Sequence, residues 1–316
     1  MNRLEFEQIT TRLKNNISTV VIGKDDVITK VLTALIAGGH VLLEDTPGTG
    51  KTLLAKSLAK SIDAKFKRVQ FTPDLLPSDI TGLNIYSQKD NEFHFIPGPA
   101  FTNILLADEI NRATPRTQSS LLECMEEHQV TVDGETRALH NPYFVIATQN
   151  PIETAGTFPL PEAQLDRFMM QLSMGYPNSD EELQLIERFL KNDPLASLSP
   201  VCQTEDILAM REFCKDIYIH ASVREYIVSL IQATRNHAEI SVGISPRGTL
   251  AFVRALQVYA SLKDRSFVTP DDVKELAYPV LAHRILTFTG FSGASKEHPL
   301  LKILSSVPVP SEDFQN

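Results

Sequence analysis

The chain has 316 residues, of which 42% are hydrophobic and 22% charged, and its formal net charge is −9. This length allows one large domain or two modest ones, and the composition is ordinary for a globular protein. The negative charge argues against a broad electrostatic grip on nucleic acid, which needs a basic face, although a local basic groove remains compatible with it.

The cysteines and the hydropathy pattern bear on where the protein works. Cys124, Cys202 and Cys214 form no C-x-x-C pair and are odd in number, which is typical of reduced thiols in the cytoplasm. The first residues lack the apolar stretch of a signal peptide, and no apolar run is long enough to span a membrane. We therefore expect a cytoplasmic protein without a membrane span.

Five short apolar runs in the first part of the chain predict strands, at 40–44, 66–71, 103–108, 143–150 and 168–174. Four of them are apolar enough to be buried on both faces, as in a parallel sheet covered by helices. Helical patterns lie between the runs, with Leu54, Leu58 and Ile62 four residues apart and another apolar stripe behind Thr114-Pro115. This alternation predicts an α/β sandwich around a five-stranded parallel sheet.

Residues 129–139 follow a different pattern. Asp133-Gly134 lies between alternating residues and predicts a β-hairpin, because both central residues of a type I′ turn need positive φ. This hairpin and the segment Phe93 to Phe95 are candidate contacts with a client or partner. A solvated edge ribbon explains the hairpin pattern equally well.

The strand pattern stops at Tyr176-Pro177. We predict a first domain over residues 1–175 and a second, all-helical domain over residues 176–316. Three predicted helix starts lie in the second domain: a capping box at Ser222 to Glu225, and N-caps at Ser245 and Thr269, each followed by proline.

The joint between the first strand and the next helix reads LLEDTPGTGKT, residues 42–52. Gly48 and Gly50 let the backbone close around phosphate oxygens, and Lys51 can reach the β- and γ-phosphates. The hydroxyl of Thr52 can bind Mg²⁺. The alternative interpretation is an ordinary glycine-rich turn between strand and helix.

Polar residues end two of the predicted strands. Asp108 can hold the hydration shell of Mg²⁺ beside a phosphate loop, and Glu109 can polarise a water for attack on the γ-phosphate. Asn150 can orient that water. Paired acids and asparagines also occur at strand ends for structural reasons alone.

Two arginines are further candidates. Arg167 leaves a short helix before the last strand, where a surface ion pair with Asp166 or Glu162 is the common alternative. Arg247 lies in the first turn of the helix after Ser245-Pro246, where a cation opposes the helix dipole. An anion must compensate it, and a nucleotide phosphate would do so.

Together these motifs resemble the MoxR family of AAA+ ATPases, from about residue 20 to residue 290. LLEDTPGTGKT resembles the Walker A loop, LLADEINRATPRTQSSLLECMEEHQVTVDG the Walker B strand with its continuation, and FVIATQNP sensor 1. GTFPLPEAQLDRF resembles the arginine-finger segment and ISPRGT sensor 2. The segments 71–82 and 95–101 are similar to the insertion in the second helix of that family.

The resemblance implies roles for individual residues. Glu109 would be the catalytic base, Asn150 would position the water, Arg167 would be a finger offered to a neighbouring subunit, and Arg247 would be sensor 2. Asp108 and Thr52 would serve the metal. The nucleotide-binding set would be Gly23, Asp45, Thr46, Pro47, Gly48, Thr49, Gly50, Lys51, Thr52 and Leu53.

Asp45 stands where the general phosphate-loop pattern has its first glycine, although MoxR-like loops often carry aspartate there. Aspartate tolerates left-handed backbone better than most residues, so we expect the turn to survive. Its charge near the phosphates is expected to weaken nucleotide binding somewhat.

The resemblance implies an ATP- and Mg²⁺-dependent ATPase that works as a homo-oligomeric ring, a hexamer, in chaperone-like remodelling or cofactor insertion. It implies a protein client and a partner with a von Willebrand factor A domain. Two alternatives remain open. One is a nucleic-acid motor, which the acidic balance and the lack of a Lys/Arg run disfavour. The other is an ATP-gated scaffold with little turnover, which the presence of Glu109, Asn150 and Arg167 disfavours.

Overall fold

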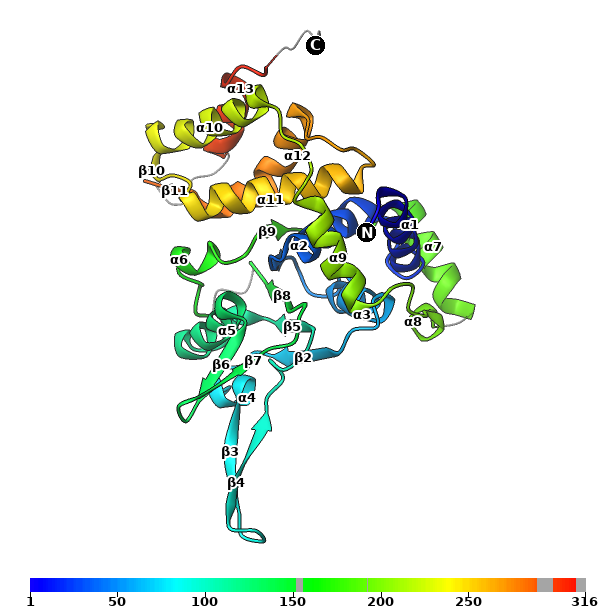
Figure 1. The fold of residues 1–316 in the computed structure, drawn as a ribbon, viewed down its shortest axis with the longest axis vertical. Helices are drawn as coiled ribbons and strands as arrows, with labels where there is room; N and C mark the ends of the chain where they lie inside the picture. The colour runs from blue at the N-terminus through cyan, green and yellow to red at the C-terminus, as the bar shows by residue number, and fades with distance from the viewer. Residues whose placement is uncertain (152–155, 192, 289–297, 311–316) are drawn as a thin grey trace.

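The computed structural model describes residues 1–151, 156–191, 193–288 and 298–310, and its centre is a five-stranded parallel sheet (Figure 1). The strand order is β2-β5-β8-β1-β9. The strands are β1 (Val41–Glu44), β2 (Phe66–Gln70), β5 (Ile104–Asp108), β8 (Phe144–Gln149) and β9 (Met170–Leu172). All five predicted strands are confirmed.

Alternate residues of the strands enter two hydrophobic clusters on opposite faces of the sheet. Val41 and Leu43 join one cluster, while Leu42 between them joins the other. This follows from the two-residue period of a strand, and it confirms the sandwich. The helices of the core are α1 (Arg3–Ser18), α2 (Asp25–Ala37), α3 (Lys51–Ser61), α4 (Pro77–Thr81), α5 (Pro115–Glu127) and α6 (Glu162–Leu165).

The C-terminal region is helical, as predicted, but it is not all-helical, because its described residues include a short antiparallel pair that the sequence did not reveal. This pair joins β10 (Ile240–Val242) to β11 (Leu286–Thr287). The helices are α7 (Ser179–Lys191), α8 (Pro194–Ser197), α9 (Thr204–Cys214), α10 (Ala221–Asn236), α11 (Pro246–Leu262), α12 (Pro270–Leu281) and α13 (Pro299–Ser306).

Two of the three predicted helix starts are confirmed. Ser245 and Thr269 each accept a backbone hydrogen bond as the N-caps of α11 and α12. The N-cap predicted at Ser222 is wrong, because α10 begins at Ala221 and the side chain of His220 accepts the N–H of Ser222. The imidazole nitrogen supplies the acceptor that we had assigned to the serine hydroxyl.

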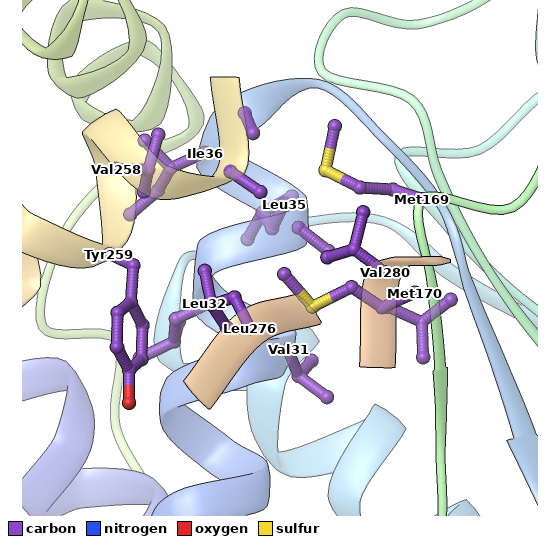
Figure 2. Packing of buried hydrophobic residues seen from close by; sticks show 14 of the residues in the cluster. Val31, Leu32, Leu35, Ile36, Met169, Met170, Val258, Tyr259, Leu276 and Val280 are labelled. Carbon is purple, nitrogen blue, oxygen red and sulfur yellow. The ribbon is translucent and has the colours of Figure 1, made fainter. Parts of the chain in front are cut away.

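The C-terminal helical region shares its hydrophobic core with the N-terminal helices. Figure 2 shows side chains of α2, α11 and α12 that converge beside β9. The labelled residues are Val31, Leu32, Leu35, Ile36, Met169, Met170, Val258, Tyr259, Leu276 and Val280, all within one cluster. A polar contact also joins the two regions, because Nε of the buried Arg284 donates a hydrogen bond to Oδ1 of Asp166 over 2.8 Å. The division at residues 175 and 176 stays a prediction.

Two hairpins extend from the side of the sheet that faces away from the C-terminal helices (Figure 1). The predicted one is β6 (Gln129–Val132) and β7 (Glu135–Ala138), and positive φ at Asp133 (51°) and Gly134 (82°) confirms its turn. The second hairpin, β3 (Gly82–Ser87) and β4 (Glu92–Pro97), lies in the insertion and projects furthest from the body. The sequence did not reveal this hairpin. Asn84 joins the two by donating to Asp133 Oδ2 over 2.7 Å.

Among the described residues, no helix combines the length and the apolar character that crossing a membrane requires.

Candidate active site

The phosphate-loop segment connects β1 to α3 at the carboxyl end of the sheet. Gly48 and Gly50 have φ of 86° and 91°, a conformation that residues with a Cβ rarely adopt. A Cβ built on Gly48 would meet no atom within 4 Å, so the loop backbone faces open space. Pro47 is exposed, and Leu53 packs against the hydrophobic cluster. The loop therefore has the shape and access of an anion cradle.

Lys51, the first residue of α3, folds back over this loop. Its Nζ donates to the carbonyl oxygens of Asp45 and Thr46, at 2.9 Å each. The hydroxyl of Thr49 reaches the same carbonyl of Thr46 at 3.4 Å. These contacts hold the ammonium group beside the loop, where phosphate oxygens would replace backbone carbonyls as its acceptors.

The side chain of Asp45 makes contacts that the sequence did not reveal. Its backbone is not in the left-handed region, so tolerance of that conformation does not explain it. Its buried carboxylate accepts hydrogen bonds from Ser173 Oγ (2.6 Å), Met174 N (2.6 Å) and Gly175 N (3.1 Å). The side chain therefore anchors the loop to the segment after β9, and three donors offset its charge.

Asp108 ends β5 on the same edge of the sheet. Its Oδ1 accepts the hydroxyl of Thr148 over 2.6 Å. Its Oδ2 accepts Nε (3.1 Å) and Nη2 (2.7 Å) of Arg68, which lies on the edge strand β2. Thr148 also accepts the backbone N–H of Glu109 at 2.9 Å, so one hydroxyl fixes both acidic residues.

Glu109 follows Asp108 in a left-handed conformation, with φ of 56°. Its Oε2 accepts Nε2 of Gln70 (2.7 Å) and Nη1 of Arg112 (2.9 Å). Asn150 is buried directly after β8, the strand between β5 and β1. Because parallel strands end at one edge, the loop, the two acids and this amide lie along the same rim.

Gly23 lies in the turn between α1 and α2, beside the start of α7. Its φ is 70°, and a Cβ there would be 2.0 Å from Cδ of Glu181. The neighbouring Lys24 donates from Nζ to the carbonyl of Tyr176 at 3.0 Å, and Thr46 donates to the hydroxyl of Tyr176 at 2.9 Å. The segment after β9 thus connects the phosphate loop to the turn at Gly23.

Arg167 and Arg247 lie away from this rim. Both pair with Glu126 on α5: Arg167 Nε is 2.8 Å from Oε2, and Arg247 Nη2 is 2.5 Å from Oε1. They line a cavity with Gly38 to His40, which precede β1, whereas the phosphate loop follows β1. The four residues of β1 span roughly 13 Å. Within one chain, the two arginines therefore lie at the amino ends of the parallel strands, and the phosphate loop lies at their carboxyl ends.

The residues at the rim fit a nucleotide with Mg²⁺. The glycine cradle and Lys51 suit phosphates, and Thr52 and Asp108 offer a hydroxyl and a carboxylate for the cation. Within the described ranges, no cluster of three or more His, Cys, Asp or Glu side chains could hold a metal by itself. A Mg²⁺ ion bound through one carboxylate and substrate phosphates needs no such cluster.

The sequence did not reveal several residues that contact the site, among them Thr148, Gln70, Arg68 and Glu126. The first three reach the acids only through the registers of β8 and β2 against β5. The partner that we expected for Arg167 was Asp166 or Glu162, and it is Glu126 instead. The anion that compensates Arg247 within the chain is the same carboxylate.

Comparison with known proteins gives the same picture. Residues 40–170 match the ATPase family associated with various cellular activities (AAA), and residues 232–302 match the AAA lid domain. The chain is 50% identical to the protein YeaC of Bacillus subtilis over 297 residues, which are 93% of each chain.

Two further proteins are similar over most of their length. The chaperone MoxR1 of Mycobacterium tuberculosis is 38% identical over 305 residues, which cover 93% of this chain and 80% of MoxR1. A crystal structure of a protein from Cytophaga hutchinsonii superposes with a TM-score of 0.90 at 38% identity, over 98% of this chain and 97% of that one. Motifs, fold and relatives agree, and the chain belongs to the MoxR family of AAA+ ATPases.

Proposed function

We propose that this protein hydrolyses ATP to ADP and phosphate, with Mg²⁺ as the metal. The observation that carries the proposal is the common rim formed by the glycine cradle, Lys51, Asp108 and Glu109. In this proposal the backbone of residues 45–50 and Lys51 bind the phosphates, and Thr52 and Asp108 bind the metal, which neutralises phosphate charge. The region around Gly23 receives the adenine.

In the proposed chemistry, Glu109 accepts a proton from the attacking water and Asn150 orients that water. Thr148 is a positioning residue, because it hydrogen-bonds Asp108 and the backbone of Glu109. Gln70 and Arg112 both donate to Oε2 of Glu109, so we expect Oε1 to be the oxygen that accepts the proton from the attacking water.

The separation of the two ends of the sheet supports catalysis between subunits. Arg167 and Arg247 are too far from the phosphate loop of their own chain to contact a nucleotide bound there, so both would act on the phosphates bound by the neighbouring subunit. Trans arginines of this kind raise the rate by about 10³–10⁵. A head-to-tail contact that repeats this arrangement closes into a ring, and we propose a homo-hexamer.

The cellular role is proposed from the family. We propose chaperone-like remodelling or cofactor insertion, on a protein client and with a partner that has a von Willebrand factor A domain. The name of MoxR1 as a chaperone supports the first of these. The three cysteines are buried and unpaired, in keeping with a cytoplasmic location. Residues 1–175 would then be the nucleotide-binding core and residues 176–316 the lid.

The two hairpins are the proposed client contact, because β3–β4 carries exposed apolar side chains such as Phe93 and touches β6–β7 through Asn84. Shortening the turn at Asp133-Gly134 should impair remodelling and leave basal ATPase intact. Loss of basal ATPase would make the hairpin a structural part of the nucleotide site.

The test of the function mixes two inactive variants. Lys51→Ala subunits have a dead nucleotide site and an intact Arg167, whereas Arg167→Ala subunits have the reverse. Mixed rings should recover part of the ATPase activity, because a Lys51→Ala subunit donates its arginine to an Arg167→Ala neighbour. If mixed rings form and no activity returns, Arg167 does not act in trans. A monomer active at full rate would refute the ring mechanism.

A further inference from the structure

A cavity of about 220 Å³ opens at the amino ends of the parallel strands, opposite the end that carries the phosphate loop. Its charged lining consists of Arg167, Arg247, Arg254 and Arg284 against Glu126 and Asp166. Four guanidinium groups therefore face two carboxylates. A surplus of positive charge in a confined space attracts an anion, because guanidinium groups keep their charge at any physiological pH.

The two carboxylates are already engaged. Asp166 accepts Nε of the buried Arg284 at 2.8 Å. Glu126 forms ion pairs with two arginines, through Oε2 with Arg167 (2.8 Å) and through Oε1 with Arg247 (2.5 Å). This sharing lowers the pKa of Glu126, chiefly through the hydrogen bond from Arg167.

Arg254 supplies the remaining cation. It lies two helical turns after Arg247 on α11, and its Nε donates to the carbonyl of Leu250, at 3.3 Å. Within the part of the chain that the structure describes, no carboxylate is within ion-pair distance of it. Its charge also disfavours the protonated form of the nearby Arg211, whose pKa is lowered first by burial and also by Arg254.

We propose that Arg167, Arg247 and Arg254 form a binding site for a phosphate group, and that Glu126 fills this site as an internal counter-ion in the isolated protomer. The two oxygens of a carboxylate accept from two guanidinium groups in the way that two oxygens of a phosphate do. A phosphate dianion brings a third acceptor and a second charge, which Arg254 can meet. Glu126 must then turn away from both arginines.

The source of the phosphate rests on the proposed function, in which the neighbour's nucleotide supplies it. Glu126 would then act as a brake. In an unassembled protomer, Glu126 prevents free anions from binding to the arginines. In the assembled ring, the phosphate of the neighbour's nucleotide displaces it. Arg254 would be a third residue that contacts this phosphate.

The first experiment measures inorganic phosphate binding by calorimetry in the Lys51→Ala background, which weakens competing binding at the phosphate loop. Adding Glu126→Gln should tighten phosphate binding at least about tenfold, the equivalent of losing one charge-assisted competitor. Adding Arg254→Ala as well should reverse most of that gain. The matched control is Glu123→Gln, an exposed glutamate one turn earlier on α5, which should change nothing.

Unchanged phosphate affinity in Glu126→Gln, with an unchanged thermal midpoint, would overturn the proposal. If the midpoint falls because the arginines repel one another, millimolar phosphate should restore it, and failure to do so would also count against the site. If Glu123→Gln tightens phosphate binding as much as Glu126→Gln does, the effect comes from the general surface charge and the proposed site is refuted.

A second experiment identifies the source of the phosphate. With Lys51 intact, Glu126→Gln should reach half-maximal ATPase at a severalfold lower protein concentration, and added free phosphate should inhibit it more than the parent. Tighter phosphate binding without that concentration shift would support the anion site and contradict the neighbour as its source. That outcome would count against the ring mechanism and leave the site standing.

Discussion

Asp45 gives the sharpest prediction, because two explanations of this residue lead to opposite results. If it merely replaces a glycine, Asp45→Gly should be harmless, and removal of its charge should strengthen ATP binding. The structure instead places its carboxylate on the side chain of Ser173 and the backbone N–H groups of Met174 and Gly175. Asp45→Ala should therefore destabilise the protein and loosen the phosphate loop.

The size of the effect follows from the three hydrogen bonds. Bonds to a charged acceptor contribute about 1.5–3 kcal/mol each. Met174 is buried and loses its partner outright, Gly175 is half-buried, and the exposed hydroxyl of Ser173 can turn to water. We therefore expect a loss of about 3 kcal/mol in the free energy of unfolding, or a drop of roughly 5 °C in Tm for cooperative unfolding of a chain this long.

Thermal unfolding and ATP-binding titrations check both parts of this prediction. Asp45→Ala should lower Tm and weaken ATP binding together, and Asp45→Asn should fall between it and the parent. Thr46→Val is the control on the same loop, because it removes only the hydrogen bond to the exposed Tyr176, which contributes about 1 kcal/mol or less. An Asp45→Gly protein with the parent's Tm and tighter ATP binding would refute the reasoning.

Three other predictions concern the rim and the buried histidines. Lys51→Ala should abolish or greatly weaken ATP binding, whereas Glu109→Gln should retain ATP and stop turnover; equal loss of binding in both would contradict the assigned roles. Thr148→Val should lower kcat at least about tenfold with little change in ATP affinity, because the two acids lose their shared hydroxyl; an unchanged kcat would remove Thr148 from the mechanism. Burial lowers the pKa of His40 to about 4 and of His283 to about 3, so the unfolded chain binds protons first as pH falls below about 6.5. Urea titrations should therefore show the free energy of unfolding falling by about 2–4 kcal/mol between pH 6.5 and 4.5, with a shallower fall in His40→Gln; a flat profile would contradict the buried neutral histidines.

Short-range patterns in the sequence determined much of the fold. The apolar runs predicted all five strands. Four of these strands are buried on both faces, which needs consecutive apolar residues, whereas the edge strand β2 is largely exposed. Gly48 and Gly50, Asp133-Gly134 and the prolines after Ser245 and Thr269 each express a backbone preference within a few residues. Such preferences are local, so the sequence reveals them without a structure. The hairpin β3–β4 and the cap at His220 were missed because their local signals are weak.

Only the tertiary structure decided which distant residues meet. Asp45 contacts residues about 130 positions later in the chain, and Glu126 joins Arg167 to Arg247 from a third element. The sequence named both arginines and assigned them to phosphate, but it did not reveal that they lie at the end of the sheet opposite the phosphate loop. That placement depends on strand order and on the packing of α2 against α11 and α12, in which one hydrophobic cluster holds lid and core together. Such contacts depend on burial and charge pairing over more than a hundred residues of sequence, where periodicity and capping signals carry no information.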